Sequence, residues 1–214
     1  MTTALPPKQN KEYSEQRVVL RNVGWDTYES LLRDLEDSSA PRLTYDRGTL
    51  EIMRPVHERH KRALEAMLDA VVAEWGIPME SLGSATFRRE ELARGFEPDS
   101  CFYFENAERV RGRDRLDLTV DPAPDLIVEI DMTHSSVDKF AIFQEIGVAE
   151  VWRYDGIRLS IRVLESGRYY ERDVSKVLPR LSRAAIEALM AERSDMIQSE
   201  WLQRIRLWAR EQLG

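Results

Sequence analysis

The segment Pro124-Asp125-Leu126-Ile127-Val128-Glu129-Ile130-Asp131 is a short apolar run that ends in two carboxylates. Its length and its branched apolar side chains predict a β-strand that is buried in a sheet. Alternate side chains of a strand share one face, so Glu129 and Asp131 point the same way, opposite the apolar side chains at 126, 128 and 130. Neighbouring carboxylates raise each other's pKa, and burial raises both further, so a bound cation would remove a cost.

Asp99 ends the segment Phe96-Glu97-Pro98-Asp99 and belongs to another strand predicted over 98–104. From a neighbouring strand, its carboxylate would be a natural further ligand. Mg²⁺ favours a few carboxylates, retained waters and substrate phosphate oxygens, so the cluster predicts a magnesium site with Asp99, Glu129 and Asp131 as ligands. The alternative is that Glu129 and Asp131 lie at a strand end, either in water or paired with arginines.

Lys139 stands near the start of a helix predicted over 137–146, shortly after the acidic strand. If its side chain folds back over the carboxylates, its ammonium would orient an attacking water or stabilise charge on a phosphorane-like transition state. The alternative is an ordinary solvated lysine on the surface of the helix.

The rest of the chain alternates helices with short strands. Apolar side chains at helical spacing predict a helix after Gly24 and a long helix that ends at Gly76. The Arg47-Gly48 turn between two short apolar runs predicts a hairpin. A meander over 150–172 and two C-terminal helices complete the pattern. This order predicts an α/β fold, a mixed β-sheet flanked by helices.

The chain has 214 residues, of which 43% are hydrophobic and 32% charged, as in a globular domain with a sizeable core. The expected division is a mobile tail over 1–16, a folded domain over 17–180 and a C-terminal helical extension over 181–214. No apolar run is long enough to span a bilayer, and the first residues lack the apolar stretch of a secretory signal. A single cysteine, Cys101, excludes an internal disulfide. We therefore expect a soluble, cytoplasmic protein.

The formal net charge of −7 bears on possible partners. Phosphate contacts supply most of the affinity of nucleic-acid-binding proteins, which usually carry a basic surface. An acidic chain is therefore not expected to bind DNA tightly unless metal ions neutralise its acidic site residues or a local patch of its surface is basic. The sequence has no glycine-rich phosphate loop, Rossmann glycine fingerprint or serine nucleophile elbow, so no motif supports those enzyme classes.

Several motifs follow one another in a fixed order: His60, then Glu97-Pro98-Asp99, the segment 124–129, Lys139, and GVAEVWRYD over 147–155. Over about residues 25–179 this set resembles the Uma family of restriction endonucleases, within the PD-(D/E)XK nuclease superfamily. The resemblance implies a restriction-endonuclease-like domain, with Mg²⁺ or Mn²⁺ as its cofactor. It also implies hydrolysis of phosphodiester bonds in nucleic acid, with DNA as the expected substrate.

The resemblance further implies roles for individual residues. Asp99 matches the first aspartate of the superfamily motif, and Glu129 matches its second acid. The superfamily's lysine is expected two residues after that acid, but this chain has Asp131 there. Lys139, on the following helix, is then the candidate for a lysine that has migrated, while Asp131 places negative charge where a positive one is expected.

The first long helix supplies two more candidates. His60 is expected to line the mouth of the site or to contact phosphate, as its place in the family pattern implies. Glu65 matches a first-helix glutamate that often completes the acidic cluster, although it could equally be a solvated partner of Lys61 or Arg62. His57 and His60 are three residues apart. The HExxH zinc motif needs a four-residue spacing, so a zinc site is not expected.

Two other patterns concern binding surfaces. Four arginines alternate in a loop and either form a basic edge for phosphates or pair with neighbouring acids, which is the favoured interpretation; they are Arg109, Arg111, Arg113 and Arg115. Trp201, Ile205 and Trp208 form one stripe of the last helix, which is typical of core packing or of an oligomer interface. A homodimer is the default assembly.

Two functions from different classes follow. The first is a magnesium-dependent DNA endonuclease with Asp99 and Glu129 at its centre. The second is a non-catalytic descendant of the nuclease fold that serves as a binding or regulatory module, an alternative motivated by the acidic net charge and by Asp131.

Overall fold

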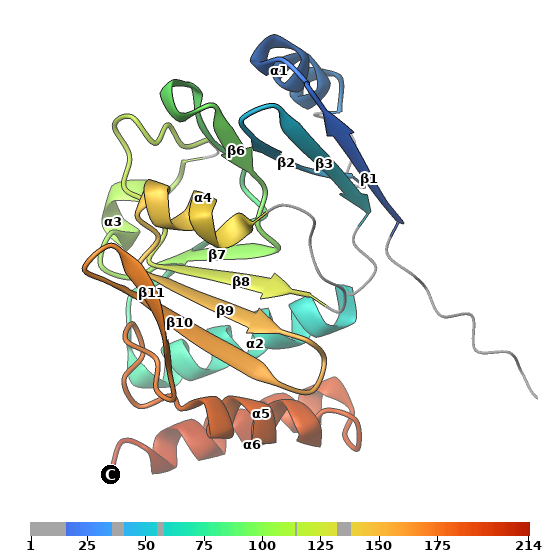
Figure 1. Ribbon diagram of the computed structural model, residues 1–214. Helices are drawn as coiled ribbons and strands as arrows, with labels where there is room; N and C mark the ends of the chain where they lie inside the picture. Colours follow the sequence, from blue (N-terminus) through green and yellow to red (C-terminus); the bar gives the residue numbers. More distant parts are fainter. Residues whose placement is uncertain (1–15, 36–40, 55–57, 114, 132–137) are drawn as a thin grey trace, which may run out of the picture.

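Two β-sheets form the framework of the computed structural model, which describes residues 16–35, 41–54, 58–113, 115–131 and 138–214 (Figure 1). The N-terminal sheet has the strand order β1-β3-β2-β6-β5, and the central sheet has the order β11-β10-β9-β8-β7-β4. The strands of the N-terminal sheet are β1 (Gln16–Arg21), β2 (Arg42–Asp46), β3 (Thr49–Arg54), β5 (Phe87–Arg89) and β6 (Arg94–Phe96). Those of the central sheet are β4 (Glu80–Gly83), β7 (Ser100–Tyr103), β8 (Leu126–Ile130), β9 (Glu150–Tyr154), β10 (Leu159–Glu165) and β11 (Arg168–Arg172).

The central sheet is mixed, as the sequence predicts. Strands β8 and β9 run parallel, and helix α4 (Lys139–Ile146) lies between them in the chain. The other neighbouring strands pair antiparallel. A parallel pair needs a crossover connection, and the segment that contains α4 supplies it. The left-handed Gly147, at φ 87°, then ends α4 and lets the chain enter β9.

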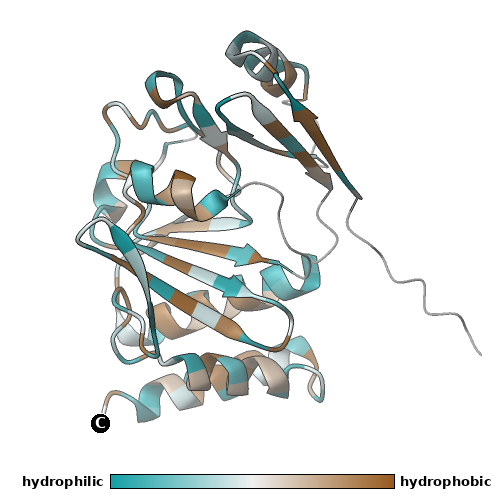
Figure 2. Ribbon diagram, viewed as in Figure 1, coloured by the Kyte–Doolittle hydropathy of each residue, from teal (hydrophilic) through white to brown (hydrophobic). Residues whose placement is uncertain are grey.

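Helices cover both faces of the central sheet (Figure 1). Helices α2 (Glu58–Trp75), α5 (Arg183–Glu192) and α6 (Gln198–Glu211) pack on one face, against a core that includes Leu126, Val128 and Ile130. Helix α4 packs on the other face, against a second cluster that includes Ile127. The alternation predicted for β8, a largely hydrophobic strand (Figure 2), is therefore confirmed. Glu129 lies on the α4 face.

The aromatic stripe of α6 packs inside the molecule. Trp201 and Ile205 are fully buried, and the indole of Trp201 donates to the Leu189 carbonyl at 2.7 Å. Trp208 contacts Trp75 of α2, with ring centroids 6.2 Å apart. The C-terminal helices thus share one hydrophobic cluster with α2 and the central sheet. The boundary expected at residue 180 remains a prediction.

The N-terminal sheet has one apolar and one charged face. Helix α1 (Trp25–Asp34) covers the apolar face, where Tyr28 packs with Leu43, Tyr45 and Leu50. The predicted hairpin is confirmed as β2 and β3, joined at Arg47-Gly48. Strand β1, which adds to the edge of this hairpin, was not predicted. Gln16, assigned to the mobile tail, is the first residue of β1; the rest of that tail lies outside the described residues.

The charged face of the N-terminal sheet is turned toward α4. Arg94 of β6 donates to the carbonyl of Ala141 at 2.7 Å and forms an ion pair with Glu145 at 3.0 Å. Its Nε also contacts Asp46 of β2 at 2.8 Å. These contacts fix the sheet against the helix that begins with Lys139.

In the described ranges, no helix combines the length and the apolar character needed to cross a bilayer.

Candidate active site

Asp99, which directly precedes β7, lies at the same level of the central sheet as Glu129 of the adjacent strand β8. Ser100 of β7 pairs with Val128 of β8 in antiparallel register, so Asp99 and Glu129 are the next facing residues. Both carboxylates are buried, with 4% of Asp99 and 7% of Glu129 exposed. The pairing of strands therefore brings together two acids that are 30 positions apart in the sequence.

Asp99 is held by contacts on both of its carboxylate oxygens. The backbone N–H of Ile130 donates to Oδ2 at 2.7 Å, which ties the aspartate to β8. Arg42 of the N-terminal sheet lies with Nη1 3.0 Å from Oδ1 and also donates to the carbonyl of Pro98. The segment Glu97-Pro98-Asp99 runs from β6 to β7, so Asp99 stands where the chain passes from one sheet to the other.

Lys139 reaches Glu129 from the first residue of α4. Its Nζ lies 2.7 Å from Oε2 of Glu129. Asp138 caps the helix by accepting from the backbone N–H groups of Phe140 and Ala141, at 3.1 and 3.4 Å. The cap fixes where α4 begins, and with it the direction of the lysine. Of the two arrangements that the sequence left open for Lys139, the structure has the one in which its side chain folds back over the acidic strand.

Burial dominates the electrostatics of Glu129. It raises the pKa of this carboxyl to about 7, aided by the charge of Asp99, while Lys139 and Arg42 act in the opposite direction. Burial alone would lower the pKa of Lys139, but the charges of Glu129 and Asp99 outweigh it and raise that pKa above its ordinary value. The lysine thus stays charged, whereas ionisation of Glu129 is disfavoured.

The N-terminal sheet contributes charged residues that the sequence analysis did not single out. Arg17 and Arg42 pair with Met53 from its two sides, so the three side chains share a face of the sheet. Glu51, two residues before Met53, lies on the same face, is 1% exposed, and has an oxygen 3.6 Å from Nε of Arg17. Its charge also raises the pKa of Lys139. The alternation of residues along the hairpin separates the charged face of the sheet from the apolar face. Only the tertiary structure shows that the charged face is covered.

The carboxylates fit a divalent cation with few protein ligands. Oε1 of Glu129 is buried and, in the part of the chain that the structure describes, has no hydrogen-bond partner. Such an atom is costly unless a cation or a water satisfies it. The described residues contain no group of three or more His, Cys, Asp or Glu side chains that could hold an ion. Asp99 and Glu129 would therefore hold it together with waters or phosphate oxygens, a set that Mg²⁺ accepts.

Asp131 is paired with an arginine beside the site. Its carboxylate forms an ion pair with Arg153 of β9, and its backbone N–H donates to the Tyr154 carbonyl at 3.0 Å. Arg153 is the register partner of Glu129. The negative charge that Asp131 adds is therefore compensated by a basic residue of the next strand.

Glu65 and His60 lie toward the other face of the central sheet, on α2. Ser100 donates to Glu65 at 2.6 Å, and Lys61 approaches the same oxygen at 3.8 Å. His60 packs edge-on against Tyr154, with ring centroids 5.7 Å apart. The structure thus brings Asp99, Glu129 and Lys139 together and places Asp131 beside them. It gives Glu65 and His60 partners of their own.

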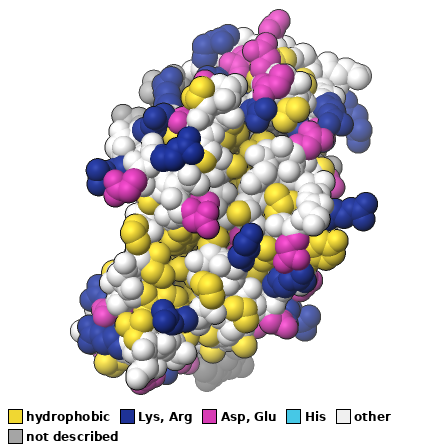
Figure 3. Space-filling view, turned by 90° about the vertical axis from the view of Figure 1, so that its left-hand side faces the viewer, with side chains coloured by type: hydrophobic (Ala, Val, Ile, Leu, Met, Phe, Trp, Pro, Cys, Tyr) yellow, Lys and Arg dark blue, Asp and Glu magenta, His cyan; other side chains and the backbone are white. Residues whose placement is uncertain are grey.

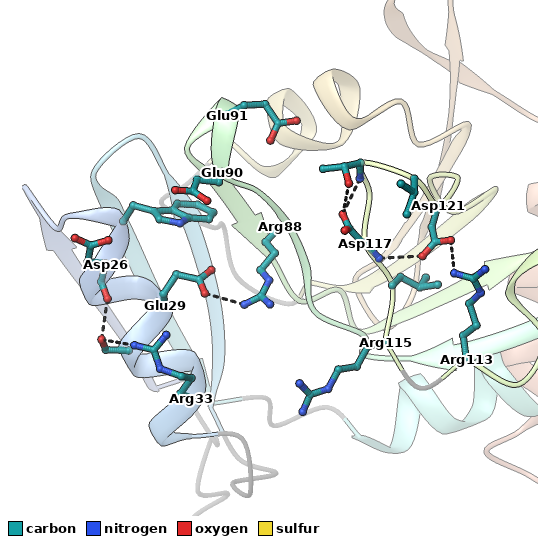
Figure 4. Close-up of a pocket in the computed structure, with 15 residues that line it drawn as sticks. Asp26, Glu29, Arg33, Arg88, Glu90, Glu91, Arg113, Arg115, Asp117 and Asp121 are labelled. Carbon is teal, nitrogen blue, oxygen red and sulfur yellow. Dashed lines mark hydrogen bonds and ion pairs between the residues drawn. The ribbon is translucent and has the colours of Figure 1, made fainter.

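Two of the four arginines in the arginine loop form ion pairs with neighbouring acids. Arg111 pairs with Glu108 at 3.0 Å, and Arg113 pairs with Asp121 at 2.6 Å. The loop borders a groove of about 870 Å³ between α1 and residues 115–121, lined by six carboxylates and four arginines (Figure 4). Acidic and basic side chains are also interspersed on the face shown in Figure 3. Neither surface is a basic track for phosphates.

The comparisons with known proteins point to a nuclease family. The model of the Uma2 family, described as "Putative restriction endonuclease", matches residues 25–196. The chain belongs to the Uma2 family. This membership and the mixed sheet flanked by helices confirm the fold class expected from the sequence, a restriction-endonuclease-like α/β fold.

The solved structures that are similar to this Uma2 chain include the crystal structure of a "putative nuclease belonging to DUF820" from Anabaena variabilis. The two sequences are 14% identical, the match covers 69% of this chain and 90% of the other, and the TM-score is 0.48. Among proteins with curated descriptions, none matches the chain.

Proposed function

We propose that this Uma2 protein is a magnesium-dependent endonuclease that hydrolyses phosphodiester bonds of DNA. The observation that carries the proposal is the facing pair Asp99 and Glu129. Oε1 of Glu129 is buried and accepts no hydrogen bond from the described residues, and Nζ of Lys139 lies 2.7 Å from Oε2 of the same carboxylate. Family membership supports the reaction class. Mg²⁺ is the proposed cation. Mn²⁺ has similar ligand preferences and is the alternative.

Each residue has a chemical role in this proposal. Asp99 and Glu129 would hold the cation, which supplies an activated water and polarises the phosphoryl oxygens when bound. Lys139 would orient that water or stabilise the charge that develops on phosphorus. Asp131 would assist through its pair with Arg153. Glu65 and His60 would act from the α2 side, where His60 is suited to a phosphate contact.

The test is cleavage of plasmid and linear DNA by the purified protein with Mg²⁺, Mn²⁺ or EDTA. Asp99→Asn and Glu129→Gln should each lower the rate by about a hundredfold or more, as expected when a site loses a ligand or a charge that acts in the transition state. Glu165→Gln is the matched control, because it removes a carboxylate from an exposed ion pair with Arg172. Metal-dependent cleavage that survives both site substitutions would refute the assignment.

One observation favours the non-catalytic module as a second candidate. Asp99, Glu129 and Asp131 each have a basic partner: Arg42, Lys139 and Arg153. A site that is neutralised by its own chain can be stable without an ion. This candidate predicts DNA or protein binding without turnover at any divalent-ion concentration, and multiple turnovers by the wild type would exclude it.

Two further properties are proposed alongside the function. A homodimer is the simplest assembly, because symmetric dimers are the commonest oligomers. A cytoplasmic location suits a magnesium-dependent nuclease that acts on DNA. Light scattering of the purified protein and fractionation of the cells that make it test the two proposals separately.

A further inference from the structure

Arg42 is a side chain of the N-terminal sheet that reaches into the candidate active site. It is the first residue of β2, only 8% exposed, and its Nη1 lies 3.0 Å from Oδ1 of Asp99. The same atom donates to the carbonyl of Pro98. The guanidinium is therefore paired with Asp99, which the proposed function assigns as a ligand of the cation.

The two oxygens of Asp99 differ in how readily they can be released. Oδ2 accepts from the backbone N–H of Ile130, which is fixed in β8. Oδ1 is held by the guanidinium of Arg42, which stands at the end of a flexible side chain. A divalent cation that binds Asp99 also repels a guanidinium that lies close to the same carboxylate. The arginine is therefore the contact that yields.

Arg42 has a second acidic partner on the side toward solvent. Its Nη2 lies 4.0 Å from Oε1 of Glu58, whose side chain is 51% exposed at the start of α2. A short movement from Asp99 toward Glu58 would keep the guanidinium next to a carboxylate. It would also present the guanidinium at the rim of the site, where a nucleic-acid backbone would approach. A guanidinium fork matches the oxygens of a phosphate group.

We propose that Arg42 is a phosphate ligand of the substrate that is held in reserve on Asp99 and released when the divalent cation binds. The proposal rests on the proposed function and adds to it a substrate-binding residue from outside the central sheet. In the cation-free protein Arg42 neutralises Asp99. In the loaded protein it contacts the DNA backbone, which compensates in part for the acidic net charge of the chain.

Two binding measurements test the proposal without relying on turnover. The first is Mg²⁺ affinity by calorimetry, and the second is the affinity for a fluorescent DNA duplex by anisotropy in Ca²⁺. In Arg42→Gln, Mg²⁺ should bind about tenfold more tightly, because a competing positive charge is gone. The duplex should bind about tenfold more weakly, because a charge-assisted phosphate contact is lost. Arg172→Gln is the control, because it makes the same change of charge in an exposed ion pair with Glu165.

The opposite signs of the two effects separate this role from a structural one. Mg²⁺ affinity that is unchanged or weaker in Arg42→Gln, or duplex affinity that is unchanged, would overturn the proposal. If Arg42→Gln does not fold, Arg42→Lys keeps the charge but loses the fork, and the duplex should bind it several-fold more weakly; unchanged binding by this variant also overturns the proposal. If the wild type binds no Mg²⁺, the proposed function itself fails, whereas Mg²⁺ binding without the predicted shift removes only Arg42.

Discussion

The environment of Glu129 opposes the charge of its carboxylate. Burial raises its pKa from an ordinary 4.5 to about 7. One of its oxygens is satisfied by Lys139, while the other is buried without a hydrogen-bond partner in the described part of the chain. Perturbed carboxyls of this kind cluster at functional sites. A cation at Glu129 would lower the pKa again and stabilise the folded state.

The pKa of Glu129 leads to a prediction about pH and stability. The folded protein keeps this proton to higher pH than the unfolded chain, so the carboxyl's contribution to stability is present below about pH 4.5 and is lost as the pH rises through 7. Glu129→Gln removes this loss. In EDTA, the Tm of the variant relative to the wild type should therefore increase between pH 4.5 and pH 7, measured by calorimetry.

Magnesium provides the control for that experiment. It should raise the Tm of the wild type at pH 7 and leave that of Glu129→Gln nearly unchanged, because a ligand that binds only the folded state stabilises it. Parallel curves of Tm against pH for the two proteins would show that Glu129 is not the group responsible.

At the scale of the elements, helix α1 packs closely against strand β6 at Gly95. A Cβ at Gly95 would lie 2.1 Å from the hydroxyl of Tyr28 and 2.7 Å from two of its ring carbons. Tyr28 is fully buried, and its hydroxyl has no hydrogen-bond partner among the described residues. Gly95 is therefore needed for the space it leaves, since its φ lies outside the left-handed region.

We predict that Gly95→Ala lowers the free energy of unfolding by about 1–3 kcal/mol, the usual cost of overpacking a core. Tyr28→Phe should be nearly neutral, because it removes a hydroxyl without a partner, and it should relieve part of the Gly95→Ala defect. Gly24→Ala is the matched control: a Cβ there meets nothing within 4 Å. Denaturant unfolding measures all four variants, and equal losses at the two glycines would contradict the packing argument.

At the scale of the whole molecule, the net charge of −7 constrains how this chain can meet a polyanion. Ion pairs neutralise two of the four arginines in the arginine loop, and the groove beside it has more carboxylates than arginines. Under the proposed function, attraction to DNA would then come from the site and from the cations that it would bind. This situation differs from that of proteins whose basic surface binds DNA without help.

The expected outcome is DNA binding that depends on divalent ions. With EDTA, the dissociation constant for a duplex should exceed about 10 μM at physiological salt, in the weak range of non-specific binding. With Ca²⁺ it should fall at least tenfold, because the acidic site is neutralised. Fluorescence anisotropy measures both dissociation constants. K⁺ is added to the EDTA buffer so that the two buffers have the same ionic strength. Equal affinity in the two buffers would point to a basic surface elsewhere.

The sequence predicted the part of the site that depends on local pattern and motif order. Alternation along β8 placed Glu129 opposite the apolar side chains, and motif order placed Asp99 and Lys139 with it. It did not predict Arg42, because a charged residue on a hairpin is usually exposed and only the packing of two sheets covers it. The separation of Glu65 from Glu129 likewise depends on which face α2 covers, and the periodicity of a helix does not contain that information.

The segment Glu97-Pro98-Asp99 connects the two sheets, and Glu97 fixes the end of this segment that leaves the N-terminal sheet. Its carboxylate accepts from the backbone of Leu43 at 2.9 Å and from Thr86 at 2.8 Å. Asp99 itself is bonded to both sheets, through Ile130 of the central sheet and Arg42 of the N-terminal sheet. An ion that binds Asp99 more tightly in one relative orientation of the sheets favours that orientation, and by thermodynamic linkage a change that favours that orientation strengthens ion binding. Substitutions far from the carboxylates, such as those at Arg94, would then change metal affinity without touching a ligand.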